Sequence, residues 1–241
     1  MSERLTTTLL LPTLNEIEAA WVVIPQLRKE WVDEIIVVDG GSTDGTVEYM
    51  RSAGLCVHLQ TVRGYGEGML EAMHLANGDI IIEFNPDGNC IPDDIPRIIA
   101  KVREGYDLVI GSRYCDGASS DDDNWLTALG NWMFTRIVNV LFGTRYTDVL
   151  VGFRAYRRSE ALRLGFDAPG LSWPCQSSTR FARAGLRVTE IAANEPARIG
   201  GTRKMMPFWT GLQITRVILR DFFTFRPDKA AAMSQARQQP L

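Results

Sequence analysis

The sequence predicts an α/β fold with a mainly parallel central sheet flanked by helices. Three observations predict it. Apolar runs of strand length recur along the chain, they alternate with segments of helical length, and several end abruptly in loops rich in Gly, Pro, Asn and Asp. Such loops cannot continue a central strand. Open α/β sheets bind ligands beyond the carboxyl ends of their strands, so we expect the site there.

The first predicted strand covers residues 7–11, and the turn Pro12-Thr13-Leu14-Asn15-Glu16 leads from it into a helix. Asn15 is a suitable N-cap for that helix. We expect the helix to extend to about Glu30 and to be interrupted at Pro25, because proline removes a helical hydrogen bond.

The second predicted strand, residues 35–39, ends in the glycine-rich loop 40–46. Glycines let backbone amides approach a ligand, and Thr43 or Asp44 can cap the helix that follows. Asp39 stands at the strand tip, where a carboxylate can accept from a base NH or a ribose hydroxyl. An ordinary capped βα loop would have the same pattern, so both interpretations stay open.

A third strand at residues 56–60 precedes Arg63-Gly64-Tyr65-Gly66-Glu67-Gly68. The GxGxG spacing differs from a dinucleotide fingerprint and is weak evidence for one. We expect a loop that places Arg63 near a bound nucleotide and leads into a helix over 69–76.

The central strand, residues 79–84, runs directly into Asn85-Pro86-Asp87-Gly88-Asn89. Asp87, with the amide oxygens of Asn85 and Asn89, can hold a hard cation such as Mg²⁺ against a diphosphate. A solvated turn after a core strand is the alternative.

The second half continues with a helix over 91–101 and a strand over 107–111, whose carboxyl end carries Ser112-Arg113-Tyr114. Residues 116–124 are polar and acidic, and are either a mobile loop over the site or a solvated surface loop. An apolar helix is expected over 125–142, with one solvated face marked by Asn131, Arg136 and Asn139. Extended structure over 147–156, a helix over 174–184 and a strand over 186–192 complete the predicted domain.

Three cations surround two glycines in Arg198-Ile199-Gly200-Gly201-Thr202-Arg203-Lys204, which predicts a diphosphate clamp or a solvated basic turn. Residues 205–226 combine many aromatics with a polar stripe. We expect this helix to lie on a membrane surface or a partner rather than only on its own domain. The predicted organisation is a domain over 1–204, an amphipathic helical segment over 205–226 and a disordered tail over 227–241.

Composition narrows the functional classes. The 241 residues carry a net charge of −3, which gives no general case for a nucleic-acid partner. The four cysteines are scattered without CxxC pairing, which argues against zinc or iron–sulfur ligation and for a reducing, cytoplasmic compartment. No apolar stretch has signal-peptide or bilayer-spanning character, so we expect a soluble or peripheral protein at the cytoplasmic face of a membrane.

Together these motifs resemble family 2 glycosyltransferases of the GT-A fold, in particular their dolichyl-phosphate mannose synthase-like branch. The resemblance spans nearly the whole chain, and it is carried by the sequences of residues 12–16, 36–46, 85–87, 111–114, 152–154 and 198–204. The Gly-Phe-Arg sequence and the basic loop are similar to the polyprenyl-phosphate branch rather than to polysaccharide synthases.

The resemblance implies roles for particular residues. Base, ribose and sugar-nucleotide contacts would come from Pro12, Leu14, Glu16, Asp39, Arg63, Asn85 and Pro86. Asp87, Asn85 and Asn89 would bind Mg²⁺ or Mn²⁺ and the diphosphate. Arg113, Arg198, Arg203 and Lys204 would neutralise phosphates, with Asp87 and Arg113 acting in catalysis. Implied partners are a nucleotide-diphosphate sugar, a polyprenyl phosphate, a membrane surface or membrane partner protein, and a second copy of the chain.

Three departures from the family pattern matter. Asn85 replaces the first carboxylate of the family's DxD motif, which should lower metal affinity, because an amide oxygen carries no formal charge. Gln176 stands where a later helix usually carries an acid. No transmembrane segment follows the domain.

The implied reaction is an inverting transfer from a GDP-mannose or UDP-glucose type of donor to a polyprenyl phosphate. A phosphate acceptor is already ionised near neutral pH and needs no general base. The alternative is a hydroxyl acceptor, which does need a base; the candidates are Asp116, Asp121, Asp122, Asp123 and Asp148. A sugar-nucleotide-binding protein without catalysis is a third possibility.

Overall fold

The computed structural model describes residues 4–201 and 206–228. Its strands are β1 (Thr7–Thr13), β2 (Glu34–Asp39), β3 (Cys56–Leu59), β4 (Ile80–Glu83), β5 (Leu108–Ser112), β6 (Arg154–Arg157) and β7 (Val188–Ala192). Its α-helices are α1 (Ile17–Val23), α2 (Thr46–Ser52), α3 (Tyr65–Leu75), α4 (Ile95–Arg103), α5 (Trp125–Phe142), α6 (Arg158–Leu164), α7 (Trp173–Arg183) and α8 (Pro207–Phe223).

The strands form one sheet in the order β3-β2-β1-β4-β6-β5-β7. Only β6 runs antiparallel to its neighbours, so the predicted mainly parallel α/β fold is confirmed. The carboxyl ends of the six parallel strands therefore share one edge with the segment that enters β6. This topology brings the loops after β1, β2, β4, β5 and β7 together.

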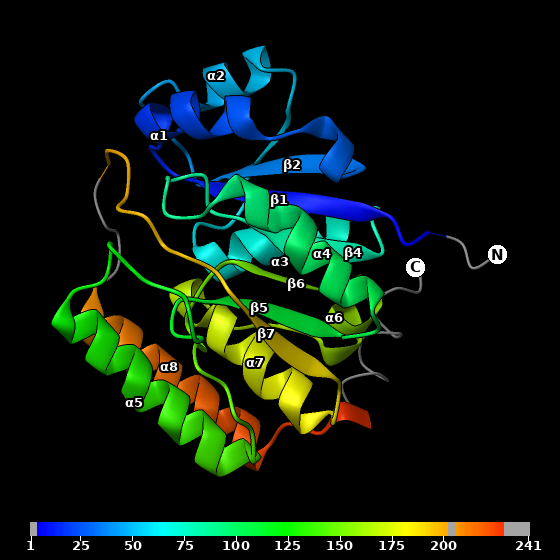
Figure 1. Ribbon diagram of the computed structural model, residues 1–241, viewed down its shortest axis with the longest axis vertical. Coiled ribbons are helices and arrows are strands. Elements are labelled where there is room, and N and C mark those ends of the chain that lie inside the picture. The colour runs from blue at the N-terminus through cyan, green and yellow to red at the C-terminus, as the bar shows by residue number, and fades with distance from the viewer. Residues whose placement is uncertain (1–3, 202–205, 229–241) are drawn as a thin grey trace.

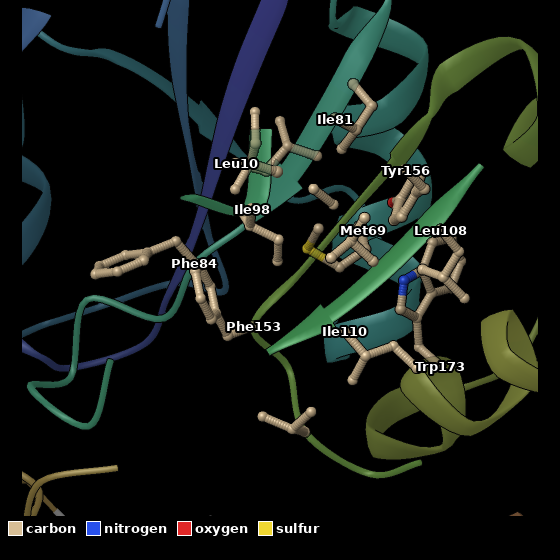
Figure 2. Close-up of a cluster of buried hydrophobic side chains, with 14 of the residues drawn as sticks. Leu10, Met69, Ile81, Phe84, Ile98, Leu108, Ile110, Phe153, Tyr156 and Trp173 are labelled. Carbon is tan, nitrogen blue, oxygen red and sulfur yellow. The ribbon is translucent and has the colours of Figure 1, made fainter. Parts of the chain in front are cut away.

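The core lies on both sides of the central strands. All four residues of β4 are fully buried, and Figure 2 shows Ile81 among side chains from several other elements. Phe84 and Phe153 meet edge to face with ring centroids 5.9 Å apart. Phe84 immediately precedes Asn85, and Phe153 stands between Gly152 and Arg154. Their packing therefore fixes the two segments that border the site.

The helices divide between two ends of the molecule. In Figure 1, α1 and α2 lie at one end, and α5 and α8 lie side by side at the other. The α8 helix packs on α5 and α7 through Ile214, Val217 and Ile218, which are buried. Within the described residues, no helix combines the length and apolar character needed to cross a bilayer.

Helix α3 begins at Tyr65, four residues earlier than predicted, so the prediction of a loop over residues 65–68 is wrong. Its glycines serve close packing rather than a turn. A Cβ on Gly66 would lie 2.1 Å from the carbonyl oxygen of Ala168, and one on Gly68 would lie 2.2 Å from Gln60. Ala168 is remote in sequence from Gly66, and Gln60 directly follows β3. A side chain at either glycine would collide with these residues.

The start of α1 also differs from its prediction. Asn15 is not the N-cap; it has φ +53°, and its Oδ1 accepts from the backbone N–H of Thr43 at 2.8 Å. The first amide of α1 instead donates to Asp44 of the neighbouring loop. The predicted interruption by Pro25 is confirmed, because α1 ends at Val23 and a 3₁₀ turn follows.

The predicted bounds of α5 are confirmed, but its predicted solvated polar face is wrong. Asn131 is buried, and Asn139 bonds to residues 144 and 146 just beyond the helix. The exposed side of α5 is instead mainly apolar, and α8, which packs beside α5, also exposes apolar side chains. We call these exposed side chains together the α5–α8 face: Trp125, Leu126, Leu129, Trp132, Met133, Ile137 and Val140 with Phe208, Trp209, Leu212, Leu219 and Phe223.

Candidate active site

The loop after β2 is organised by Asp39, which is fully buried. Its Oδ1 accepts from the backbone amides of Gly41 and Ser42 at 2.9 and 2.7 Å, and its Oδ2 accepts from the hydroxyls of Ser42 and Thr13. Four donors thus hold one carboxylate. Asp39 orders this loop directly, and any ribose contact would have to share its oxygens with these donors.

The sequence predicts that Arg63 lies near a bound nucleotide, and in the structure its side chain lies against the loop after β2. A Cβ on Gly41 would lie 3.4 Å from Arg63 Nη2, so the guanidinium covers the loop where glycine has φ +96°. Leu14, from the turn after β1, packs against Gly40 on the same loop. Pro12, within β1, pairs with Val38 of β2 beside these residues.

The turn after β4 places Asp87 at the centre of the shared edge, and only 5% of it is exposed. Arg198 bridges two carboxylates there: Nη2 donates to Asp87 Oδ2 at 2.5 Å, and Nη1 donates to Glu16 at 3.0 and 3.2 Å. Burial raises the pKa of Asp87, although the Arg198 charge acts in the opposite direction. The three residues come from the loops after β1, β4 and β7.

Asn85 and Asn89 flank Asp87 as the sequence predicts. The backbone amide of Asn89 donates to Asp87 Oδ1 at 3.3 Å. The side chain of Asn85 lies beside Gly152, where a Cβ would come within 3.0 Å of its Nδ2 and 3.2 Å of the Tyr65 hydroxyl. The glycine of Gly-Phe-Arg thus leaves space for this amide, a role that sequence reasoning missed.

A second arginine, Arg113, lies at the carboxyl end of β5. Its Nε and Nη2 donate to the two oxygens of Asp148 at 2.7 and 3.1 Å, and its Nη1 donates to Glu195 at 3.3 Å. Asp123 adds a third carboxylate 3.7 Å away. Asp148 is fully buried, so this pair belongs to the protein interior.

Sequence reasoning missed Glu195, which connects several parts of this edge. It accepts from Arg113 and Ser120, and Asn89 Nδ2 lies 3.5 Å from its Oε1. Burial raises the pKa of Glu195 against the effect of the Arg113 charge. Its position three residues beyond the end of β7 is only a weak local signal, since it is the pairing of β7 with β5 that brings Glu195 to this edge.

The segment over residues 116–124 is tied to this cluster. The backbone amide of Asp121 donates to Glu195 O, and that of Glu195 donates to Ser119 O, each at 2.8 Å. Asn124 then caps α5 by accepting from the amides of Leu126 and Thr127. Mobility of this segment stays a prediction; its middle is bonded to Glu195, and its last residue caps α5.

These contacts limit the choice of a general base. Asp148 is fully buried and bound at both oxygens by Arg113, while Asp123 pairs with Arg113 and Tyr114. Gln176 is buried and accepts from the backbone amides of residues 167 and 168, so it holds a loop. Among the other candidate carboxylates, Asp116 and Asp121 are exposed. Asp122 is partly exposed, and its charge acts on both Asp87 and Arg198.

The donor set around Asp87 fits a divalent cation with modest affinity. Asp87 and Glu16 both pair with Arg198, and Asn85 and Asn89 stand on either side of Asp87 in the chain. The described residues include no cluster of three or more His, Cys, Asp or Glu side chains placed to hold a metal. Arg203 and Lys204, predicted phosphate ligands, lie outside the described residues.

Comparison with known proteins identifies the family. The sequence model of the family described as "Glycosyl transferase family 2" matches residues 8–164. The chain belongs to this family. That span runs from β1 to the end of α6 and includes the loops that carry Asp39, Asp87 and Arg113.

Curated relatives extend the similarity beyond that span. The undecaprenyl-phosphate mannosyltransferase of Micrococcus luteus is 30% identical over 211 residues, which is 81% of this chain and 86% of that protein. The dolichyl-phosphate hexose transferase of Haloferax volcanii is 29% identical, covering 86% of this chain and 90% of its own length. Glycosyltransferase AglJ of the same organism is 31% identical over 80% of this chain, which spans 64% of AglJ.

Solved structures show the same fold. Glucosyl-3-phosphoglycerate synthase from Mycobacterium tuberculosis, in complex with Mn²⁺ and uridine-diphosphate-glucose, matches with a TM-score of 0.71 and 25% identity. The match covers 90% of this chain and 79% of that one. The predicted GT-A fold is confirmed.

Proposed function

We propose that this glycosyltransferase moves a sugar from a nucleotide-diphosphate sugar to a polyprenyl phosphate, with inversion at the anomeric carbon. The relatives with high mutual coverage are named for undecaprenyl and dolichyl phosphates. The single structural observation that carries the proposal is the pairing of Asp148, a candidate general base, with Arg113. Both carboxylate oxygens of Asp148 accept from Arg113, so Asp148 is poorly placed to take a proton, and an acceptor that is already ionised suits this site best.

In the proposed mechanism, an oxygen of the acceptor phosphate attacks the anomeric carbon as the bond to the nucleotide diphosphate breaks. A divalent cation, Mg²⁺ or Mn²⁺, would supply charge stabilisation for the leaving diphosphate when bound. Asp87, Asn85 and Asn89 would hold it.

The chain's own residues would position the donor. The loop ordered by Asp39 would hold base and ribose, with Pro12, Leu14 and Glu16 on one side and Arg63 on the other. We assign phosphate neutralisation to Arg113, Arg198, Arg203 and Lys204. Arg113 would reach a phosphate by exchanging its contact with Glu195, since its two bonds to Asp148 are the shorter ones.

The α5–α8 face supports a lipid acceptor. Trp125 and Phe208 are each 77% exposed and Val140 is 81% exposed. The two helices, described throughout, contain one acidic residue, Asp221, which is buried, while Arg136 and Arg216 are exposed. An apolar face bordered by cations is typical of a helix lying on an anionic bilayer surface.

The face also adjoins the site. Helix α5 starts at the end of the 116–124 segment, which is bonded to Glu195 and thereby to Arg113. A lipid phosphate at the bilayer surface would therefore lie within reach of Arg113. We propose peripheral binding at a cytoplasmic membrane surface through α5 and α8 together; a membrane partner protein or a second copy of the chain are the competing occupants.

A hydroxyl acceptor is the second candidate. The structural neighbour that is 25% identical is titled a glucosyl-3-phosphoglycerate synthase, and one of its structures holds phosphoglyceric acid. Asp116 and Asp121 are the exposed carboxylates that such a reaction would have available. The sequence relatives and the α5–α8 face favour the lipid phosphate.

The test is a transfer assay with purified protein, a panel of UDP- and GDP-sugars, and Mg²⁺ or Mn²⁺. Each donor is incubated with and without polyprenyl phosphate in detergent, and lipid-linked sugar is detected by mass spectrometry. We expect one donor class to label the lipid phosphate. Donor hydrolysis that is unchanged by the lipid would contradict the proposed acceptor.

A further inference from the structure

Arg198 occupies an unusual position for a residue expected to bind phosphate. Its guanidinium lies between the carboxylates of Asp87 and Glu16, the place where two negative charges converge. The side chain of Arg198 is 19% exposed. Within the described part of the chain, its buried Nε has no hydrogen-bond partner. Two of its nitrogens are thus paired with carboxylates, while a third donor has no acceptor.

The segment that carries Arg198 is attached independently of the guanidinium. The amide of Ile199 donates to the carbonyl of Asp87 at 2.9 Å, and the Ile199 side chain packs where a Cβ on Gly88 would come within 2.6 Å. Gly200 and Gly201 both have positive φ, and a Cβ on Gly200 would collide with Glu18. Backbone and apolar contacts therefore hold this segment independently of the Arg198 guanidinium.

The charge balance explains why a cation must be present at this point. Asp87 is nearly buried and Glu16 is 7% exposed, so two carboxylates without a positive charge would repel one another in a poorly solvated place. Arg198 supplies one positive charge, and the two terminal nitrogens of its planar guanidinium donate to one carboxylate each. A divalent cation at Asp87 would supply two, and would compete with the guanidinium for the same Asp87 oxygen.

We propose that Arg198 is an exchangeable internal counter-cation, which neutralises Asp87 and Glu16 in the free enzyme and moves to the donor diphosphate when metal binds. This inference deepens the proposed function, because it rests on a metal–diphosphate donor. The exchange conserves charge pairing at each step: metal replaces guanidinium at the carboxylate, and diphosphate replaces carboxylate at the guanidinium. Metal and nucleotide binding are thereby coupled through one side chain.

The proposal predicts opposite effects of one substitution on two ligands. Arg198→Gln removes the competitor at Asp87, so Mn²⁺ alone should bind about tenfold more tightly, the effect of an ion pair of intermediate burial. The same substitution removes a diphosphate ligand, so UDP or GDP in saturating Mn²⁺ should bind about tenfold more weakly. A residue that only stabilised the loop would lower both affinities.

The experiment is an electron paramagnetic resonance titration of Mn²⁺ without nucleotide, followed by calorimetric titration of UDP and GDP with Mn²⁺ present. Arg28→Gln is the matched control, because Arg28 is exposed and stacks on Trp31 away from these carboxylates. It makes the same charge change and should leave both affinities within about twofold. Arg198→Lys keeps the charge without the fork and should lie between wild type and Arg198→Gln.

Mn²⁺ affinity in Arg198→Gln that equals or falls below that of wild type, with circular dichroism unchanged, would overturn the proposal. If Arg198→Gln fails to fold, the same criterion applies to Arg198→Lys. If wild type shows no measurable Mn²⁺ binding, appearance of binding in the variant supports the exchange, and its continued absence refutes it. None of these readouts uses lipid or transfer, so failure of the proposed lipid acceptor is scored separately.

Discussion

The two arginines of this edge show how one residue type can be fixed in one place and exchangeable in another. Arg113 donates twice to a fully buried aspartate, and Asp148 in turn accepts from the backbone amides of residues 150 and 151. Arg198 joins two carboxylates from different loops, and its buried Nε has no hydrogen-bond acceptor among residues 4–201 and 206–228. The first cluster is built like a structural ion pair, and the second like a site held ready for another cation.

The difference follows from where the carboxylates stand. Asp148 lies in the segment entering β6, and its neighbour Thr147 is held by Glu190 of β7, so the Arg113 cluster links three strands of the sheet. Asp87 and Glu16 lie in turns that follow strands, and Arg198 lies beyond β7. Carboxylates in loops can accept a new ligand without disturbing the sheet.

The largest expected effect comes from breaking the fixed cluster. Asp148→Asn leaves the Arg113 guanidinium largely buried without its main counter-ion, which should lower the free energy of unfolding by about 3 kcal/mol. Urea unfolding followed by circular dichroism measures it. Asp116→Asn, an exposed aspartate at the start of the 116–124 segment, is the control and should change stability by less than about 0.5 kcal/mol. Equal effects of the two would refute the structural assignment of Asp148.

The next largest effect is expected for membrane binding by the α5–α8 face, in a variant that leaves both arginine clusters intact. Replacing Trp132 and Trp209 by Ser removes two exposed aromatics of the α5–α8 face, and should weaken binding to anionic vesicles at least tenfold. UDP and GDP affinity should not change. Vesicle co-sedimentation is the measurement, and Trp21→Ser, an exposed tryptophan on α1, is the control. A shift from dimer to monomer in the double variant, with vesicle binding unchanged, would instead assign the face to a second copy of the chain.

A smaller effect sharpens the exchangeable cluster. Asn85→Asp restores a carboxylate beside Asp87 and should tighten Mn²⁺ binding several-fold, because a carboxylate is a better ligand than an amide for a hard cation. Since the Asn85 side chain lies against Gly152 and Tyr65, the substitution keeps the volume that this pocket accepts. Gln26→Glu, at an exposed position in the 3₁₀ turn after α1, makes the same change from amide to carboxylate away from Asp87 and is the control. Unchanged Mn²⁺ affinity in Asn85→Asp would place the metal away from Asn85.

The smallest effect is on the loop that leads to Arg63. Burial alone would raise the pKa of Glu71, but hydrogen bonds from Thr61, His58 and Val62 outweigh it and lower the pKa from 4.5 to about 2. The folded-state pKa is below the unfolded one, so the stabilisation is present above about pH 4.5 and is lost as the pH falls toward 2.

Glu71→Gln should therefore cost about 1 kcal/mol of stability at pH 7 and almost nothing near pH 2. Thermal unfolding of wild type and variant across this range measures the difference. A difference that stayed constant with pH would mean that the charge of Glu71 does not contribute.

The sequence predicted the sheet well because strand length, apolar runs and loop chemistry are local properties. β2 ends at Asp39 as predicted, and β4 and β5 end at Glu83 and Ser112, each within one residue of the predicted end. The motifs after these strands come together because parallel strands end at one edge. Asn85, Asp87 and Arg198 were identified from these motifs alone.

The errors share a different cause, since each depended on tertiary packing that local sequence patterns do not show. Gly66 and Gly68 looked like turn residues, but Ala168 and Gln60 pack against them inside a helix. Asn131 looked like a solvated residue of α5 and is buried. Glu195 gave almost no local signal, and only the pairing of β5 with β7 places it beside Arg113.

A competition between two acceptors tests most directly whether the sugar is transferred to a phosphate oxygen. Wild-type protein with its preferred donor is offered polyprenyl phosphate and polyprenol in parallel, and each product is identified by mass spectrometry. We expect sugar on the phosphate alone. Asp116→Asn and Asp121→Asn should each retain a transfer rate within about threefold of that of wild type. Transfer to the polyprenol hydroxyl, with a loss of 100-fold or more in one of these variants, about what removing a general base costs, would contradict this expectation.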